Sequence, residues 1–193
     1  MFEHLKNYHI ILASNSPRRR ELLGGLGVPF EVKVLPDISE TYPDTLPADE
    51  TAEYIAVEKA AAYRPFLQPD DLVITADTVV ICGDEVLGKP TDAADAQRML
   101  RLLSGRTHHV VTGVCLLTSQ FQRSFCVKTD VTFKTLDDEE IDYYIRTYQP
   151  MDKAGAYGIQ EWIGYIGVTG LHGSYFNVMG LPVQRIYEEL KKL

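Results

Sequence analysis

The chain is predicted to be an α/β protein, because strand-like and helix-like segments alternate along its 193 residues. Short apolar runs and runs with a period of two indicate strands, whereas apolar residues three and four positions apart indicate helices. The composition agrees with a soluble globular protein, since 45% of the residues are hydrophobic and 24% are charged. A chain of this length can form one sizeable core.

The first strand and helix form a turn suited to an anion. The apolar run at 9–13 predicts a buried strand, and the segment SNSPRRRELLG follows it directly. Ser16 is predicted to cap a helix that begins at Pro17, where the missing N–H of proline costs nothing. The backbone N–H groups and the positive end of the helix dipole would then face an anion above the strand.

Three arginines, Arg18 to Arg20, occupy the first turn of this helix. Successive helical residues are rotated by about 100°, so the three side chains spread over about 200° and cannot all reach one phosphate cluster. One or two of them would bind and at least one would be solvated. The alternative is a surface helix with a basic first turn, which is mildly unfavourable because cations there oppose the dipole.

The elements that follow are predicted in order. The first are a strand at 30–34, a polar loop at 36–47, a helix at about 48–63, a strand at 72–76 that ends at Asp77, and a strand pair at 79–81 and 86–87. They are followed by an amphipathic helix at 92–103, two strands at 107–117 and 121–133, and a helix that Asp137 and Glu140 begin with a capping box. The segment 155–173 is too rich in glycine to be helical, and Pro182 begins a terminal helix.

Four positions outside the arginine turn could carry chemistry. Asp77 is expected at the end of an apolar strand, at the rim where α/β sheets bind ligands. Lys89 lies between a glycine and a proline, which is also typical of a solvated turn. Glu40 lies in an acidic loop that could bind a hard cation, although such loops are more often only solvated. The turn at 155–160 presents the neutral amide of Gln160.

Charge and cysteine content exclude several classes of protein. The formal net charge is −8, so the chain is a poor candidate for binding nucleic acid polymers. Its three cysteines have no CxxC spacing, which argues against a disulfide framework or a zinc site and favours a reducing cytoplasm. No apolar run approaches the ~20 residues that span a bilayer, and the N-terminal residues lack the apolar core of a secretion signal.

Several ordered motifs resemble the Maf family of nucleoside triphosphate pyrophosphatases over nearly the whole chain. They are Ala13–Arg19 with Leu22 and Leu23, Glu40, Glu58–Ala60, Ala76–Val80, Gly88–Pro90, Ser104–His108 and Thr112–Val114. The segment Ala154–Gln160 is similar to the branch that acts on dTTP and UTP. The resemblance implies a single Maf/ITPase-like domain over 1–193, with an elongated mixed sheet, flanking helices and two lobes around a nucleotide-binding cleft. It also implies a possible homodimer, because members of the family are often dimeric.

The resemblance further implies a role for each site residue. Asp77 would be the catalytic proton acceptor, and Glu40 would join it in binding a divalent cation, Mg²⁺ or Mn²⁺. Base specificity would belong to Arg19, Thr78 and Gln160. Phosphate binding would belong to Ser14, Arg18, Lys59 and Lys89. One departure is Ser39, where many relatives have an acidic residue beside the glutamate.

The implied reaction converts dTTP or UTP to the monophosphate and pyrophosphate in the cytoplasm. The cationic side chains would offset charge on the leaving pyrophosphate, and Asp77 would orient or deprotonate the attacking water or hold the metal. The alternative is a regulator of septation that binds nucleotide without turnover. No nucleic acid polymer and no membrane are expected as partners.

Overall fold

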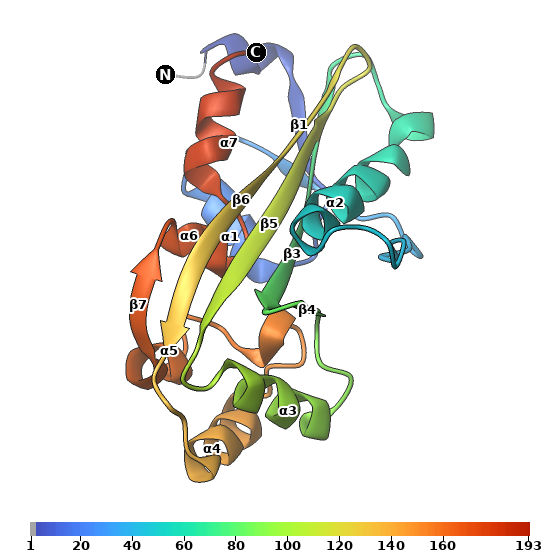
Figure 1. Cartoon of the computed structure of the whole chain (residues 1–193). Coiled ribbons are helices and arrows are strands. Elements are labelled where there is room, and N and C mark those ends of the chain that lie inside the picture. Colours follow the sequence, from blue (N-terminus) through green and yellow to red (C-terminus); the bar gives the residue numbers. More distant parts are fainter. Residues whose placement is uncertain (1–2) are drawn as a thin grey trace. The chain divides into compact units, whose positions relative to one another are not determined.

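The computed structural model describes residues 3–193, which form a mixed α/β fold built on one seven-stranded sheet (Figure 1). The strand order is β2-β1-β3-β5-β6-β7, and β4 pairs with β3. The strands are β1 (His9–Leu12), β2 (Glu31–Val32), β3 (Asp71–Cys82), β4 (Glu85–Leu87), β5 (Thr107–Leu117), β6 (Gln122–Phe133) and β7 (Val168–His172). Since β1 runs parallel to β2 and β3 whereas β3–β4 and β6–β7 are antiparallel, the prediction of a mixed sheet is confirmed.

Helices flank this sheet, as predicted. The α-helices are α1 (Pro17–Gly24), α2 (Thr51–Ala61), α3 (Ala93–Leu103), α4 (Asp138–Tyr148), α5 (Trp162–Gly167), α6 (Tyr175–Met179) and α7 (Val183–Leu190). Short 3-10 helices lie at Glu3–Asn7, Ala48–Glu50, Arg64–Phe66 and Ala154–Ala156.

The described chain divides into two compact units. Unit 1 contains the chain up to Asp77, Thr112–Val127 and Gly180–Leu193, and unit 2 contains Thr78–Val111 and Lys128–Met179. In unit 1, α2 packs on the sheet through Ala56 and Ala60, which meet buried strand residues such as Val73. In unit 2, α3 and α4 pack through an apolar cluster that includes Leu100, Phe133 and Tyr144.

Local signals predicted the starts of α1 and α4 correctly. Ser16 caps α1, with its side chain accepting a hydrogen bond from the Arg19 N–H at 3.4 Å, and Pro17 is the first helical residue. Asp137 and Glu140 form the predicted capping box of α4. Both devices depend on residues three positions apart, so the sequence alone contains the information.

The prediction that a strand ends at Asp77 is wrong. β3 continues without a break from Asp71 to Cys82, so Asp77 and Thr78 lie inside a twelve-residue strand. The two residues are partly exposed, whereas the rest of the strand is buried. The polar pair therefore marks a local change in burial within the strand. In the sequence alone, such a pair resembles the end of a strand.

The prediction that 155–173 contains no helix is also wrong, because Trp162–Gly167 forms α5. A Cβ atom at Gly164 would lie 1.8 Å from the Ile159 carbonyl oxygen, so glycine is required by a close backbone approach at the start of this helix. Packing of Ile163, which is fully buried, supports a helix that glycine content disfavours.

Residues 1–2, which belong to the N-terminal stretch predicted to lack a secretion signal, lie outside the described residues. Of the helices in the rest of the chain, none combines the length and apolar character needed to cross a membrane. Cys82, Cys115 and Cys126 are free thiols.

Candidate active site

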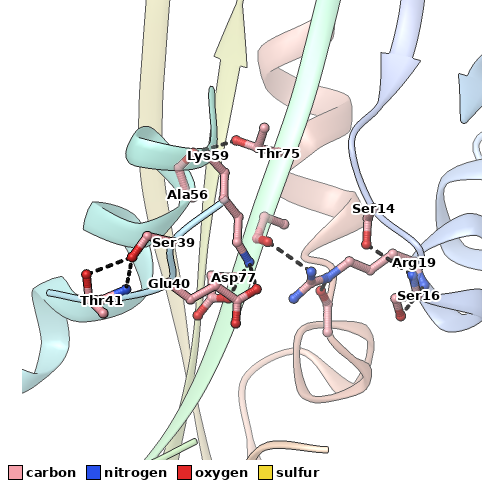
Figure 2. Close-up of polar contacts among 12 residues, drawn as sticks. Ser14, Ser16, Arg19, Ser39, Glu40, Thr41, Ala56, Lys59, Thr75 and Asp77 are labelled. Carbon is pink, nitrogen blue, oxygen red and sulfur yellow. Dashed lines mark hydrogen bonds and ion pairs between the residues drawn. The ribbon is translucent and has the colours of Figure 1, made fainter. Parts of the chain in front are cut away.

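A lysine ammonium contacts two carboxylates at the centre of the candidate site (Figure 2). Lys59 Nζ lies 2.8 Å from Asp77 Oδ1 and 2.7 Å from Glu40 Oε1. The side chains of Lys59 and Asp77 are 13% and 14% exposed, whereas that of Glu40 is 51% exposed. The structure thus brings together three predicted site residues from a loop, a helix and a strand, with the ion pair to Asp77 shielded from water.

The backbone places Lys59 and Asp77 opposite each other. Lys59 projects from α2 and Asp77 from β3, and the buried Thr75 hydroxyl donates to the Ala56 carbonyl at 2.6 Å. Thr75 precedes Asp77 by two residues and Ala56 precedes Lys59 by three, so this hydrogen bond joins the two elements next to the ion pair.

Gly113 on β5 lets α2 approach the sheet closely. A Cβ atom there would lie 2.3 Å from the backbone of Ala52 and Glu53, closer than any real side chain tolerates. The position of Lys59 therefore depends on a glycine on another strand. In the sequence Gly113 stands out only as part of a family motif, although an isolated glycine within a strand is itself a signal of close backbone approach.

Arg19 is held beside Asp77 by main-chain carbonyls. Its Nη1 donates to the Ala76 carbonyl at 2.9 Å and its Nε donates to the Gly180 carbonyl at 2.8 Å. Burial lowers the pKa of Arg19 from its usual value, and the negative charge of Asp77 opposes this effect. The guanidinium is thus a fixed, partly desolvated cation, and Gly180 is a contributor that the sequence analysis did not identify.

The turn before α1 partly satisfies its own hydrogen-bonding groups. The hydroxyl of Ser14, which is buried, accepts from the Ser16 N–H at 3.2 Å. Arg18 is half-buried and follows this turn directly. Ser14 therefore has a structural contact of its own, in addition to the phosphate-binding role that the resemblance implies.

Three predicted site residues belong to unit 2. Thr78 follows Asp77 along β3 and is half-buried, and Lys89 is exposed after β4. Gln160 is half-buried, but its Oε1 atom is buried and has no hydrogen-bond partner among residues 3–193. The Gly155 N–H donates to the Gly88 carbonyl at 3.0 Å, so the segments that carry Gln160 and Lys89 are joined by the backbone.

The metal donors are limited in number. Among the described residues, no three His, Cys, Asp or Glu side chains gather where they could hold an ion. Glu40 and Asp77 nevertheless direct oxygen atoms at the same lysine nitrogen. Two carboxylate oxygens therefore converge on the position that this ammonium group occupies. This donor set suits Mg²⁺, which proteins usually bind through one or two carboxylates together with substrate phosphates and water.

The site of this mixed α/β protein is thus a lysine between two carboxylates, with a half-buried arginine beside them. Residues 9–193 match the family model described as "Maf-like protein". The chain therefore belongs to the Maf-like protein family.

Named relatives agree with this assignment, and a solved structure has a similar fold. The chain is 67% identical, over all of both chains, to a protein of Phocaeicola vulgatus named "dTTP/UTP pyrophosphatase". It is 58% identical, again over all of both chains, to a Bacteroides fragilis protein of the same name. The Staphylococcus aureus Ham1 protein has a similar fold, with a TM-score of 0.54, 16% identity and coverage of 94% of this chain and 99% of that one.

Proposed function

We propose that this protein is a nucleoside triphosphate pyrophosphatase that hydrolyses dTTP and UTP to the monophosphate and pyrophosphate. The observation that supports this most strongly is full-length identity of 67% to a relative named for that activity. The cluster of Glu40, Lys59 and Asp77 supports it independently, because it combines a carboxylate that can act on water with a cation that can bind a phosphate.

In this proposal the protein mainly positions the substrate and stabilises charge. Water attacks the α-phosphorus, the bond between the α-phosphorus and the bridging oxygen breaks, and pyrophosphate leaves with the extra negative charge. Asp77 accepts the proton of the attacking water. Arg18, Lys59, Lys89 and the hydroxyl of Ser14 bind phosphate oxygens, so that negative charge moves toward fixed donors as the bond breaks.

A divalent cation, Mg²⁺ or Mn²⁺, is proposed to bind to Glu40 and Asp77. Bound there, it would lower the pKa of a coordinated water and neutralise phosphate charge. Lys59 occupies the position between these carboxylates in the protein alone. Substrate phosphates would give the ammonium a second set of oxygen partners and leave the carboxylates available to the cation.

Base recognition is proposed for Gln160, Arg19 and Thr78. Uracil and thymine present an acceptor at O4 and a donor at N3, whereas cytosine presents the opposite pattern. A glutamine amide can donate to O4 and accept from N3–H at once. The Oε1 atom of Gln160, without a hydrogen-bond partner in the part of the chain that the structure describes, is an acceptor suited to an N3–H donor. Arg19, which has only donors, favours an acceptor over the exocyclic amine of cytosine.

The activity is tested by incubating the purified protein with dTTP or UTP and a divalent cation. We expect the monophosphate and pyrophosphate in equal amounts. A diphosphate and orthophosphate would place attack at the γ-phosphorus and contradict the proposal. Binding without turnover would instead support a regulatory role.

We propose the cytoplasm as the compartment, which the free thiols of the three cysteines support.

The base assignment is tested with Gln160→Ala and Arg19→Ala on UTP and CTP. A site that leaves a buried polar group unpaired rejects the wrong ligand strongly, so we expect the unaltered protein to prefer UTP by at least about 10²-fold in kcat/KM. Each substitution should reduce kcat/KM for UTP more than for CTP. Equal losses on both substrates would assign these residues to structure or to phosphate binding.

A further inference from the structure

The loop that carries Gln160 has an unusual backbone that needs external support. Gly155 and Ala156 both have positive φ, of 68° and 59°. A left-handed conformation is unfavourable for an alanine, and Ala156 is fully buried. A Cβ atom at Gly155 would lie 2.8 Å from Val80 Cγ2, so glycine is also required by packing. Contacts from outside the loop must therefore hold this conformation.

Three hydrogen bonds from different segments of unit 2 hold the loop. The Gly155 N–H donates to the Gly88 carbonyl, as described above. Tyr157 Oη and His108 Nε2, on β5, share a hydrogen bond of 2.7 Å. The Gly158 N–H donates to the hydroxyl of Tyr144, on α4, at 2.9 Å, and that hydroxyl donates to Glu161. The anchors thus fall at three of the four residues from Gly155 to Gly158.

The contact between His108 and Tyr157 is the most isolated from solvent. His108 is 0% exposed and Tyr157 is 5% exposed. Their rings lie 5.4 Å apart edge to face, and both make edge contacts with Phe133. Burial lowers the pKa of His108 to about 4, so the imidazole is neutral near pH 7 and acts as a hydrogen-bonding group.

This histidine is an unfavourable choice for packing alone. Its Nδ1 atom is buried and lacks a hydrogen-bond partner within residues 3–193. An unpaired polar atom in a core costs stability that an apolar side chain would avoid. Departures of this kind concentrate at functional sites, and within the described part of the chain the side-chain hydrogen bond of this ring leads to the Gln160 loop.

We infer that His108 and Tyr157 are positioning residues that hold the backbone of the Gln160 loop in place, so that the Gln160 amide meets uracil in preference to cytosine. A displaced glutamine amide no longer meets O4 and N3–H of uracil together, and discrimination against cytosine depends on both contacts. Tyr157 lies three residues before Gln160, so its anchored hydroxyl limits the movement of the backbone that carries the amide. The inference rests on the proposed function, in which Gln160 contacts the base.

The first test is Tyr157→Phe, which removes one hydroxyl and keeps the ring. We expect the ratio of kcat/KM for UTP to that for CTP to fall at least about tenfold, with KM for UTP raised and kcat changed little. Tyr148→Phe is the matched control, because Tyr148 stacks on Tyr144 through its ring at 5.2 Å. The control should keep the ratio of the unaltered protein.

A double-mutant cycle separates positioning from general structural damage. If Tyr157 acts through Gln160, then Tyr157→Phe should not change the ratio further in a protein that already carries Gln160→Ala. A ratio that is unaffected by Tyr157→Phe, or reduced equally in both backgrounds, overturns the positioning role and leaves base reading by Gln160 intact. If Gln160→Ala alone leaves the ratio unchanged, base reading fails and the inference fails with it.

A second pair of variants at His108 keeps the test valid if Tyr157→Phe unfolds. His108→Gln places an amide nitrogen where Nε2 lies and can retain the bond to Tyr157, whereas His108→Leu cannot. We expect the glutamine variant to keep the UTP preference and the leucine variant to lose it. Melting temperatures are measured for all variants. Equal ratios in two folded His108 variants would overturn the inference.

Discussion

At the scale of single residues, the site depends on a cation shared by two carboxylates that differ in exposure. Asp77 forms an ion pair with Lys59 in a shielded position, whereas Glu40 reaches the same ammonium from a loop that is open to water. Charge-assisted hydrogen bonds strengthen when water is excluded. The two carboxylates therefore differ in how firmly the protein positions them, and this difference separates the effects expected from substituting each one.

Substituting Asp77 by asparagine should abolish most of the activity and preserve the fold. The amide keeps the size of the side chain and an oxygen for Lys59, but it removes the negative charge and the ability to accept a proton from water. We expect kcat to fall at least about 10²-fold, the scale for loss of a positioned acid–base group. The measurement is steady-state hydrolysis of UTP beside a thermal melt. Unchanged kcat in a folded variant would make Asp77 structural.

Substituting Glu40 by glutamine should weaken the use of the metal. A neutral amide oxygen is a poorer ligand for a hard cation than a carboxylate. We expect a higher concentration of Mg²⁺ or Mn²⁺ to be needed for half-maximal activity, and no activity when the cation is removed with a chelator. Ser39→Ala is a suitable control, because Ser39 lies next to Glu40 but its hydroxyl bonds to Thr41. Full activity in excess chelator would contradict the proposed cation.

At the scale of elements, the site depends on how closely one helix approaches the sheet. α2 carries Lys59, β3 carries Asp77, and Gly113 on β5 removes the side chain that would separate α2 from the sheet. The bond from Thr75 to Ala56 then ties the helix to β3. Helix and strand are thus positioned by contacts at residues that do not themselves react.

Gly113→Ala should destabilise the protein and disturb the site. The added Cβ atom would meet the backbone of α2 at 2.3 Å, so the helix must move. Overpacking of this kind costs about 1–3 kcal/mol of unfolding free energy. Gly170→Ala on β7 is the control, since a Cβ atom there meets Thr132 at an ordinary 3.5 Å.

Urea denaturation and UTP hydrolysis of both glycine variants check this prediction. We expect the Gly113 variant to unfold at lower urea and to hydrolyse UTP more slowly because Lys59 is displaced. The Gly170 variant should change little in activity. If the two variants lost equal stability and the Gly113 variant kept full activity, the close approach of α2 would be unimportant for the site.

At the scale of the whole molecule, two histidines link stability to pH in opposite directions. The hydrogen bond to Asp71 raises the pKa of His9 above 6.5, against a smaller opposing effect of desolvation and with help from Glu31. Burial, assisted by the charge of His109, lowers the pKa of His108 to about 4. The unfolded chain titrates both groups near 6.5.

The sign of each contribution follows from these pKa directions. His9 is held more firmly when protonated, so its stabilisation is complete below 6.5 and is lost as the pH rises through its raised folded value. His108 resists protonation in the folded state, so stability is lost as the pH falls from 6.5 toward 4.

Unfolding free energies measured by urea denaturation across this pH range provide the test. We expect His9→Gln to flatten the dependence on the alkaline side of about 6.5 and His108→Gln to flatten it on the acid side. Each variant should keep the slope of the unaltered protein on the other side. If the pH dependence of stability persists above about 6.5 in His9→Gln, or below about 6.5 in His108→Gln, then other groups cause it.

The sequence by itself determined the features that depend on nearby residues. The cap at Ser16 and the capping box of Asp137 and Glu140 each join residues three positions apart, and both were predicted. The bounds of β5 agree with the predicted segment at 107–117. A long alternating or buried apolar run predicts a strand even when the strands that it pairs with are unknown. Family motifs also predicted Glu40, Lys59 and Asp77 as site residues, and the structure brings these three together.

Only the tertiary structure decided how those side chains are held. It placed Asp77 within a continuous strand and brought Lys59 to both Asp77 and Glu40. It also showed that Arg19 is fixed by carbonyls at Ala76 and Gly180. These contacts join residues that are 18 to 161 positions apart, and their geometry is set by helix and sheet packing. Local propensity contains no information about such pairs, because their distances arise only when the core forms.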